Sequence, residues 1–175
     1  MDETDFLARE QARLEVLRAT GLLDTAPERE FEALVDLARL LTGCKQAAIS
    51  LVDADRQWFK AQRGLDTSQT PRDEAFCSVV VDQDAPLIVS DASAHERFRS
   101  YPPVVGSPHI RFYAGMPLRA RALPDEPHVP LGTLCVIDSK PRGRFSEADR
   151  ISLEALAERT VEALERRKIR NAAAG

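Results

Sequence analysis

The stretch Ile-Arg-Phe-Tyr-Ala-Gly-Met-Pro-Leu-Arg at residues 110–119 decides the fold class. Apolar side chains stand at every second position from Ile110 to Leu118, and a period of two is typical of a β-strand. Arg111 and Tyr113 fall on the opposite face. Shorter apolar runs predict further strands, at residues 47–53, 57–63, 86–90 and 131–138. Because a short polar turn joins the first two of these runs, we expect a hairpin and a mostly antiparallel sheet.

Helical periodicity precedes the first predicted strand. Leucines spaced for one face predict a helix over residues 4–20. A second helix is expected to begin at Thr25, because Thr25 and Glu28 have the spacing of a capping box and Pro27 falls in the first turn. Gly43 is expected to end this helix.

The final helix has the clearest start. Ser146 and Asp149 form a capping-box pair, and the apolar spacing predicts a helix over residues 146–169. Its apolar residues make a narrow seam with balanced charge on both flanks, which favours packing against another helix. We therefore expect a homodimer formed by the first and last helices. The seam consists of Leu153, Leu156, Thr160, Val161 and Leu164.

Composition narrows the class of protein. The chain has 175 residues, of which 43% are hydrophobic and 30% charged, and this is typical of one globular domain. A net charge of −4 argues against nucleic acid as the main partner. No apolar run approaches the roughly 18 residues of a membrane span, and residues 1–10 do not form a signal peptide. An odd number of separated cysteines favours a reducing cytoplasm over secretion.

Several blocks, in order, resemble a bacterial GAF domain. They are Gly21-Leu22-Leu23-Asp24-Thr25, Ile49-Ser50-Leu51-Val52-Asp53, Arg56-Gln57-Trp58-Phe59-Lys60-Ala61, Thr70-Pro71-Arg72-Asp73 with Ala75-Phe76-Cys77, Ile110-Arg111-Phe112-Tyr113-Ala114-Gly115, and Leu131-Gly132-Thr133-Leu134-Cys135-Val136-Ile137-Asp138. The resemblance implies an α+β fold with a six-stranded antiparallel sheet and helices on both faces. We accordingly expect an N-terminal helix at 1–20, a GAF domain at 21–170 that includes the last helix, and a disordered tail at 171–175.

The resemblance also implies a function. Such domains are small-molecule sensing or dimerisation modules, usually found beside histidine kinase or cyclic-dinucleotide enzyme domains. In that fold a ligand sits between one sheet face and the connections that follow the first hairpin. One departure concerns the later connection, where Asp91 and Ala92 match the family but His95 replaces its usual aspartate. We expect an unidentified ligand, no identified cofactor, and a signalling partner such as a histidine kinase.

Candidate ligand-binding residues follow from the resemblance and from residue chemistry. Arg72 either pairs with Asp73 at the start of a short helix or offers its planar fork to an acidic ligand. Arg111, within an apolar strand, either reaches solvent or meets an acidic partner or ligand. Trp58 and Phe59 point to opposite faces, so at most one shares a pocket wall with Phe112. The full candidate set is Trp58, Arg72, Asp73, Phe76, Cys77, Asp91, Arg111, Phe112 and Tyr113.

Four functions compete at this point. A non-catalytic sensor that signals through its terminal helices is favoured, because no catalytic motif is present. A free methionine sulfoxide reductase of the GAF type would need two thiols in mutual reach, and Cys77 and Cys135 are its candidates, although no neighbour along the chain activates them. A bilin photoreceptor lacks its Cys-His pair. A dimerisation scaffold without a ligand stays open. No Cys-x-x-Cys motif supports a metal site, and Cys44 has no second cysteine close to it in the sequence.

Overall fold

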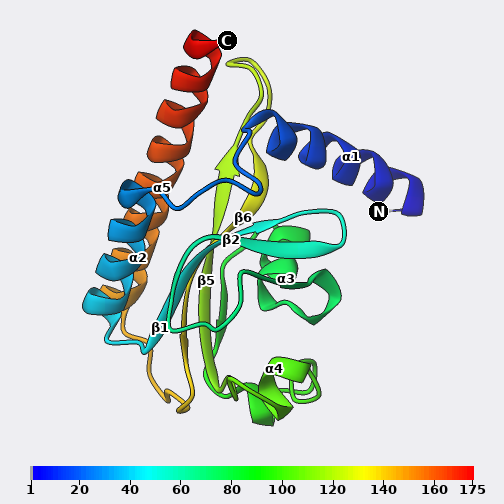
Figure 1. The fold of residues 1–175 in the computed structure, drawn as a ribbon. Coiled ribbons are helices and arrows are strands. Elements are labelled where there is room, and N and C mark those ends of the chain that lie inside the picture. Colours follow the sequence, from blue (N-terminus) through cyan, green and yellow to red (C-terminus); the bar gives the residue numbers. More distant parts are fainter. Residues whose placement is uncertain (1) are drawn as a thin grey trace.

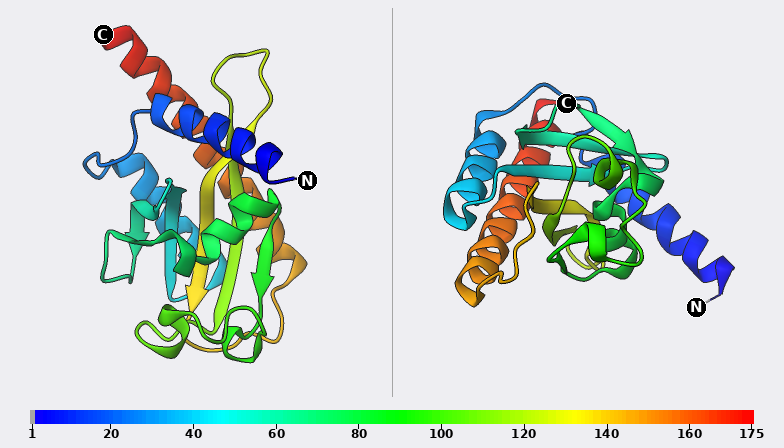
Figure 2. Two further views of the ribbon diagram at one scale, coloured as in Figure 1. Left: turned by 90° about the vertical axis from the view of Figure 1, so that its right-hand side faces the viewer. Right: turned by 90° about the horizontal axis from the view of Figure 1, so that it is seen from below.

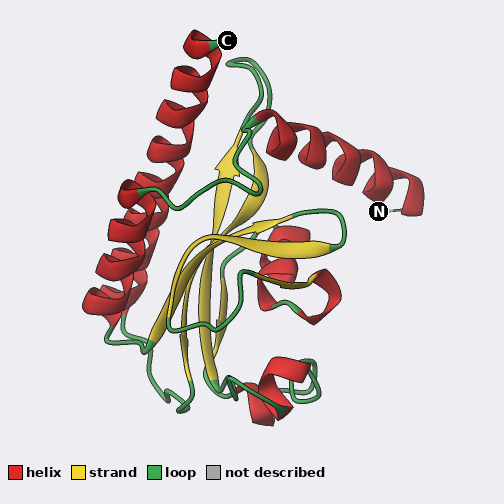
Figure 3. Cartoon of the chain, in the orientation of Figure 1, coloured by secondary structure: helices red, strands yellow, loops and turns green. Residues whose placement is uncertain are grey.

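A six-stranded antiparallel sheet organises the computed structural model, which describes residues 2–175 (Figure 1). The strand order is β3-β2-β1-β6-β5-β4, with helices on both faces (Figure 3), and this confirms the predicted fold class. The elements, in chain order, are α1 (Glu3–Ala19), α2 (Arg29–Thr42), β1 (Gln46–Val52), β2 (Arg56–Arg63), β3 (Gln69–Pro71), the 3-10 turn η1 (Arg72–Glu74), α3 (Phe76–Gln83), β4 (Leu87–Val89), the 3-10 turn η2 (Ala92–Ala94), α4 (Pro102–Val105), β5 (Phe112–Ala120), β6 (Val129–Asp138) and α5 (Glu147–Ala174).

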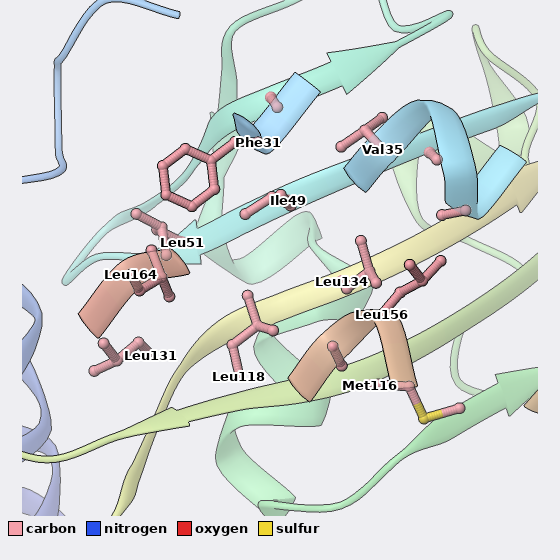
Figure 4. Close-up of a cluster of buried hydrophobic side chains, with 14 of the residues drawn as sticks. Phe31, Val35, Ile49, Leu51, Met116, Leu118, Leu131, Leu134, Leu156 and Leu164 are labelled. Carbon is pink, nitrogen blue, oxygen red and sulfur yellow. The ribbon is translucent and has the colours of Figure 1, made fainter. Parts of the chain in front are cut away.

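The sheet separates two hydrophobic clusters. On one face, α2 and α5 lie side by side and cover β1, β6 and β5 (Figure 1). Figure 4 shows this core, with Phe31 and Val35 of α2 facing Ile49 of the sheet and Leu156 and Leu164 of α5 facing the neighbouring strands. The opposite face carries α3, α4 and the connections between them. Since both faces are covered, every residue of β1 is buried.

The apolar seam of α5 is occupied within the protomer. Leu153, Leu156, Thr160 and Leu164 are all buried, because α5 packs against both α2 and the sheet. The expectation that this seam pairs with a second chain is therefore wrong. Two helices share one face of the sheet, so each needs only a narrow apolar stripe to cover its half.

Local differences from the expected elements have identifiable causes. Thr25 does not cap α2, which begins at Arg29 after an extended segment; the Thr25 hydroxyl instead donates to the Leu22 carbonyl at 2.5 Å. The capping box of Ser146 and Asp149 is confirmed. Helix α5 continues to Ala174, over residues expected to form a disordered tail, because a run of alanines has high helix propensity.

Over residues 2–175, no helix has the length and apolar character that spanning a bilayer demands.

A close backbone approach at a glycine lies at the centre of the sheet. Gly132 of β6 pairs with Leu51 of β1, and a Cβ atom added at Gly132 would lie 1.8 Å from the Ser50 carbonyl oxygen. That oxygen belongs to the backbone of a fully buried strand, so it cannot move aside cheaply. Glycine is thus required at this position for the two strands to pair.

Gly132→Ala is expected to lower the free energy of unfolding by at least about 2 kcal/mol, because the new methyl group forces β1 and β6 apart. Urea denaturation monitored by circular dichroism measures this loss. Gly143→Ala is the matched control, since a Cβ there meets no atom within 4 Å. A Gly132→Ala protein as stable as this control contradicts the assignment.

Candidate functional site

A cavity of about 340 Å³ lies on the sheet face opposite α2 and α5. Its floor is the sheet, with Phe59, Tyr113, Cys135 and Ile137 among the floor residues. The segment 65–77, which holds β3, η1 and the start of α3, forms one wall, and the connection around α4 forms another. This is the position that the family resemblance implied, between one sheet face and the connections after the first hairpin.

Aromatic packing fixes the wall that α3 contributes. The ring of Phe76 stacks on Phe98 with centroids 4.4 Å apart and on Tyr113 with centroids 5.0 Å apart. Tyr101 meets Phe76 edge to face at 5.6 Å. Such pairs stabilise beyond the area they bury, so the stack holds α3 and the 91–105 connection together over the sheet.

Two cysteines meet beneath this stack. The sulfur atoms of Cys77 on α3 and Cys135 on β6 lie 4.0 Å apart. The Tyr113 hydroxyl lies 3.2 Å from Cys77 Sγ, and the Thr133 hydroxyl donates to the same sulfur at 3.1 Å. Gly115 makes this possible, because a Cβ there would lie 2.3 Å from the Tyr113 hydroxyl oxygen. The fold therefore brings the two thiols into mutual reach and gives Cys77 hydroxyl neighbours that spacing along the chain did not predict.

These contacts change the acidity of the thiols. Burial raises the pKa of Cys77, but the hydrogen bonds from its polar neighbours outweigh burial and lower the pKa to about 6. The interaction with ionised Cys77, together with burial, raises the pKa of Cys135 well above its usual range. Burial also raises the pKa of Cys44, which lies on the other face of the sheet. The contacts thus move the pKa values of the two facing thiols in opposite directions, down for Cys77 and up for Cys135.

The structure brings together three of the residues expected to bind a ligand. Phe76, Cys77 and Tyr113 line the cavity. Trp58 and Phe112 share a face, but it is the face covered by α2 and α5, so neither reaches the cavity. Phe59 takes the place expected for Trp58.

The charged residues expected at the site lie outside the cavity. Asp91 caps η2 by accepting from the Ser93 amide at 3.0 Å. Arg111 donates to the backbone carbonyl of Val104 at 2.9 Å. Asp73 is exposed, and within residues 2–175 it pairs with neither Arg72 nor Arg111. None of these charges lines the cavity.

Arg72 points out of the cavity wall toward α1. Its guanidinium pairs with Glu10 of α1 and with Asp82 of α3, the latter at 3.1 Å, and donates to the Asp53 carbonyl at 3.0 Å. Burial raises the pKa of Glu10, but hydrogen bonds and charges from Arg13 and Arg72 outweigh it and lower the pKa to about 2. Sequence spacing gave no sign of this ion pair, because 62 residues separate its members.

Several residues that line the cavity belong to no sequence motif that would predict a binding role. Gln57 accepts from the Ser50 hydroxyl at 2.9 Å and donates to the Thr70 hydroxyl at 2.6 Å, which ties β1, β2 and β3 together beside the cavity. Asp66 and Glu74 stand at the cavity wall. They flank β3, a three-residue strand that the sequence pattern does not predict. Among the described residues, no three His, Cys, Asp or Glu side chains gather as a metal site requires.

Comparison with known proteins agrees with this architecture. A cyclic di-GMP phosphodiesterase of Pseudomonas aeruginosa is 40% identical over 148 residues, which cover 85% of this chain but 24% of that protein; the chain spans about a quarter of its length. The GAF domain of an Acinetobacter phosphoenolpyruvate-protein phosphotransferase superposes with a TM-score of 0.64 at 20% identity, covering 95% of each chain. A free methionine-R-sulfoxide reductase from Neisseria meningitidis superposes with a TM-score of 0.59 at 19% identity, covering 95% of this chain and 94% of that one.

These two structural likenesses establish the fold alone, because both lie at low sequence identity. The family model of the GAF domain matches residues 26–164, which hold the whole sheet, the cavity and most of α5. The chain therefore belongs to the GAF domain family.

Proposed function

We propose that this GAF domain is a non-catalytic sensor, which binds a small molecule in the cavity and passes the change to its terminal helices. One observation carries the proposal: the cavity wall at η1 is joined to α1 by the ion pair of Arg72 and Glu10. Pro71 and Glu74 line the cavity on either side of Arg72 along the chain. A ligand that moves this wall therefore moves the guanidinium that holds α1.

Helix α1 is suited to receive such a movement. Arg13 fixes the helix to the sheet by donating to the Val52 carbonyl at 2.7 Å. It also pairs with Glu10 within α1 at 2.7 Å, which orients the carboxylate that Arg72 meets. The N-terminal half of α1 projects beyond the sheet, and the C-terminal end of α5 extends from the domain as well (Figure 2). Both ends are thus available to an output partner.

The output partner is a signalling enzyme under this proposal. The similar stretch of the Pseudomonas relative belongs to a much longer protein named as a phosphodiesterase, so a cyclic-dinucleotide enzyme domain is one such partner and a histidine kinase another. The homodimer remains a prediction and needs a surface other than the α5 seam. Exposed apolar residues that could form one are Phe6, Leu7, Leu37, Leu40 and Leu41.

Native mass spectrometry of the protein purified from its own host is expected to show a bound small molecule, since a cavity of this size is at the small end of the roughly 300–1,000 Å³ range of ligand sites. Leu65→Trp fills the cavity and should remove the bound mass. Leu123→Trp makes the same change on an exposed loop outside the cavity and should retain it. A protein without adduct in every preparation favours the scaffold without a ligand.

Glu10→Gln is expected to lower stability at pH 7 by about 1 kcal/mol, a value discounted because Glu10 is partly solvated. The folded-state pKa of Glu10 lies below the ordinary glutamate value of 4.5, so the ion pair stabilises the protein above that value and is lost as the pH falls through about 2. The difference between the two proteins should therefore shrink across this window in urea denaturation. Glu15→Gln, which removes a carboxylate elsewhere on the same helix, is the control at pH 7, and a pH-independent difference for Glu10→Gln contradicts the ion pair.

A second candidate function rests on the thiol pair. Cys77 and Cys135, 4.0 Å apart, could reduce a sulfoxide: the Cys77 thiolate attacks sulfur, the oxygen leaves as water with two protons, and Cys135 closes a disulfide as the sulfide departs. This is the chemistry of a free methionine sulfoxide reductase. Within residues 2–175, however, no Lys, Arg or His lines the cavity to stabilise the reacting oxygen.

Incubation with free methionine-R-sulfoxide and dithiothreitol distinguishes the two functions. The sensor proposal predicts no methionine above a protein-free control, in the wild type or in Cys77→Ser. Amino-acid analysis by chromatography measures the product. Catalytic turnover that is lost in Cys77→Ser and retained in Cys44→Ser would establish the reductase instead.

A further inference from the structure

The charged side chains that line the cavity are all acidic. Asp66 and Glu74 are the charged residues among its lining, and over the described part of the chain no Lys, Arg or His joins them. Neither carboxylate has a hydrogen bond or ion pair within residues 2–175. Glu74 is half-buried in η1, where removal from water makes an unpaired charge costly, whereas Asp66 is exposed at the rim and contributes its charge only.

Two arginines next to lining residues along the chain already have acidic partners outside the cavity. Arg72 pairs with Glu10 and Asp82 outside the wall. Arg56 pairs with Asp24 at 2.7 Å and donates to the Gln69 side chain at 2.8 Å. An anionic ligand would therefore meet two carboxylates and no free cation.

The rest of the lining combines apolar side chains with neutral polar ones such as Gln57, Thr70 and Ser107. Phe59, Phe76, Ile110 and Ile137 form much of its surface, and such walls favour a ligand with an apolar or aromatic body. Unpaired carboxylates at the wall favour a positive end on the same molecule. We propose that the cavity selects a small organic ammonium with an apolar body and rejects anions, phosphate esters included; this inference rests on the proposed small-molecule site.

Three probes of similar size test the charge preference: 2-phenylethylamine, 2-phenylethanol and phenylacetate, which are a cation, a neutral molecule and an anion at pH 7. Isothermal titration of the full chain is expected to rank them in that order, with the amine about fivefold tighter than the alcohol and the anion undetected. Raising the salt concentration should weaken the amine alone.

Glu74→Gln and Asp66→Asn should each reduce the preference for the amine over the alcohol and leave the affinity for the alcohol unchanged. Glu126→Gln, on the 123–130 loop outside the cavity, removes one charge elsewhere and should change neither affinity. Equal binding of all three probes, or a preference that survives both substitutions, overturns the charge inference while the small-molecule site stands. Failure of every probe to bind overturns both.

Discussion

The antiparallel pairing of β1 with β6 is the interaction on which the rest of the structure depends. Gly132 lets β6 come so close to the Ser50 carbonyl that any side chain there would collide with it. Both strands are covered on both faces, so this pairing defines one face for the core and another for the cavity. The same pairing places Cys135 on the cavity side, where Cys77 approaches it from α3.

The two faces of the sheet differ in packing and in the length of the elements that cover them. The face under α2 and α5 is closely packed with apolar residues and forms the larger of the two hydrophobic clusters. The other face holds an aromatic stack, two thiols and a cavity, and its walls come from short elements such as β3, η1 and α4. Short elements with few contacts rearrange more easily than the core, which suits a surface that responds to a ligand. Arg72 connects this responsive wall to α1.

The sequence predicted the elements better than it predicted the site. The period-two pattern located β5, and it correctly separated Trp58 from Phe59. Periodicity shows which residues share a face, but it does not show which face holds a cavity. For this reason the sequence predicts Trp58 and Phe112 at the site and omits Phe59, which lines the cavity. Ile110 departs from its predicted face because it precedes β5, after the positive φ of His109.

Contacts between distant segments were beyond the reach of sequence spacing. Cys77 and Cys135 are 58 residues apart, and their meeting depends on where α3 docks on the sheet. The same limit hid the pairing of Arg72 with Glu10, whereas the capping box of α5 was visible because its members are three residues apart.

Hydrogen exchange of the α1 amides, followed by mass spectrometry with and without saturating 2-phenylethylamine, tests the central claim most directly. The account predicts that the probe changes exchange in α1 as well as in residues 69–77, and that Arg72→Gln abolishes the change in α1 while the change in the cavity wall remains. A wild-type protein whose cavity wall responds to the probe while α1 does not would contradict the account.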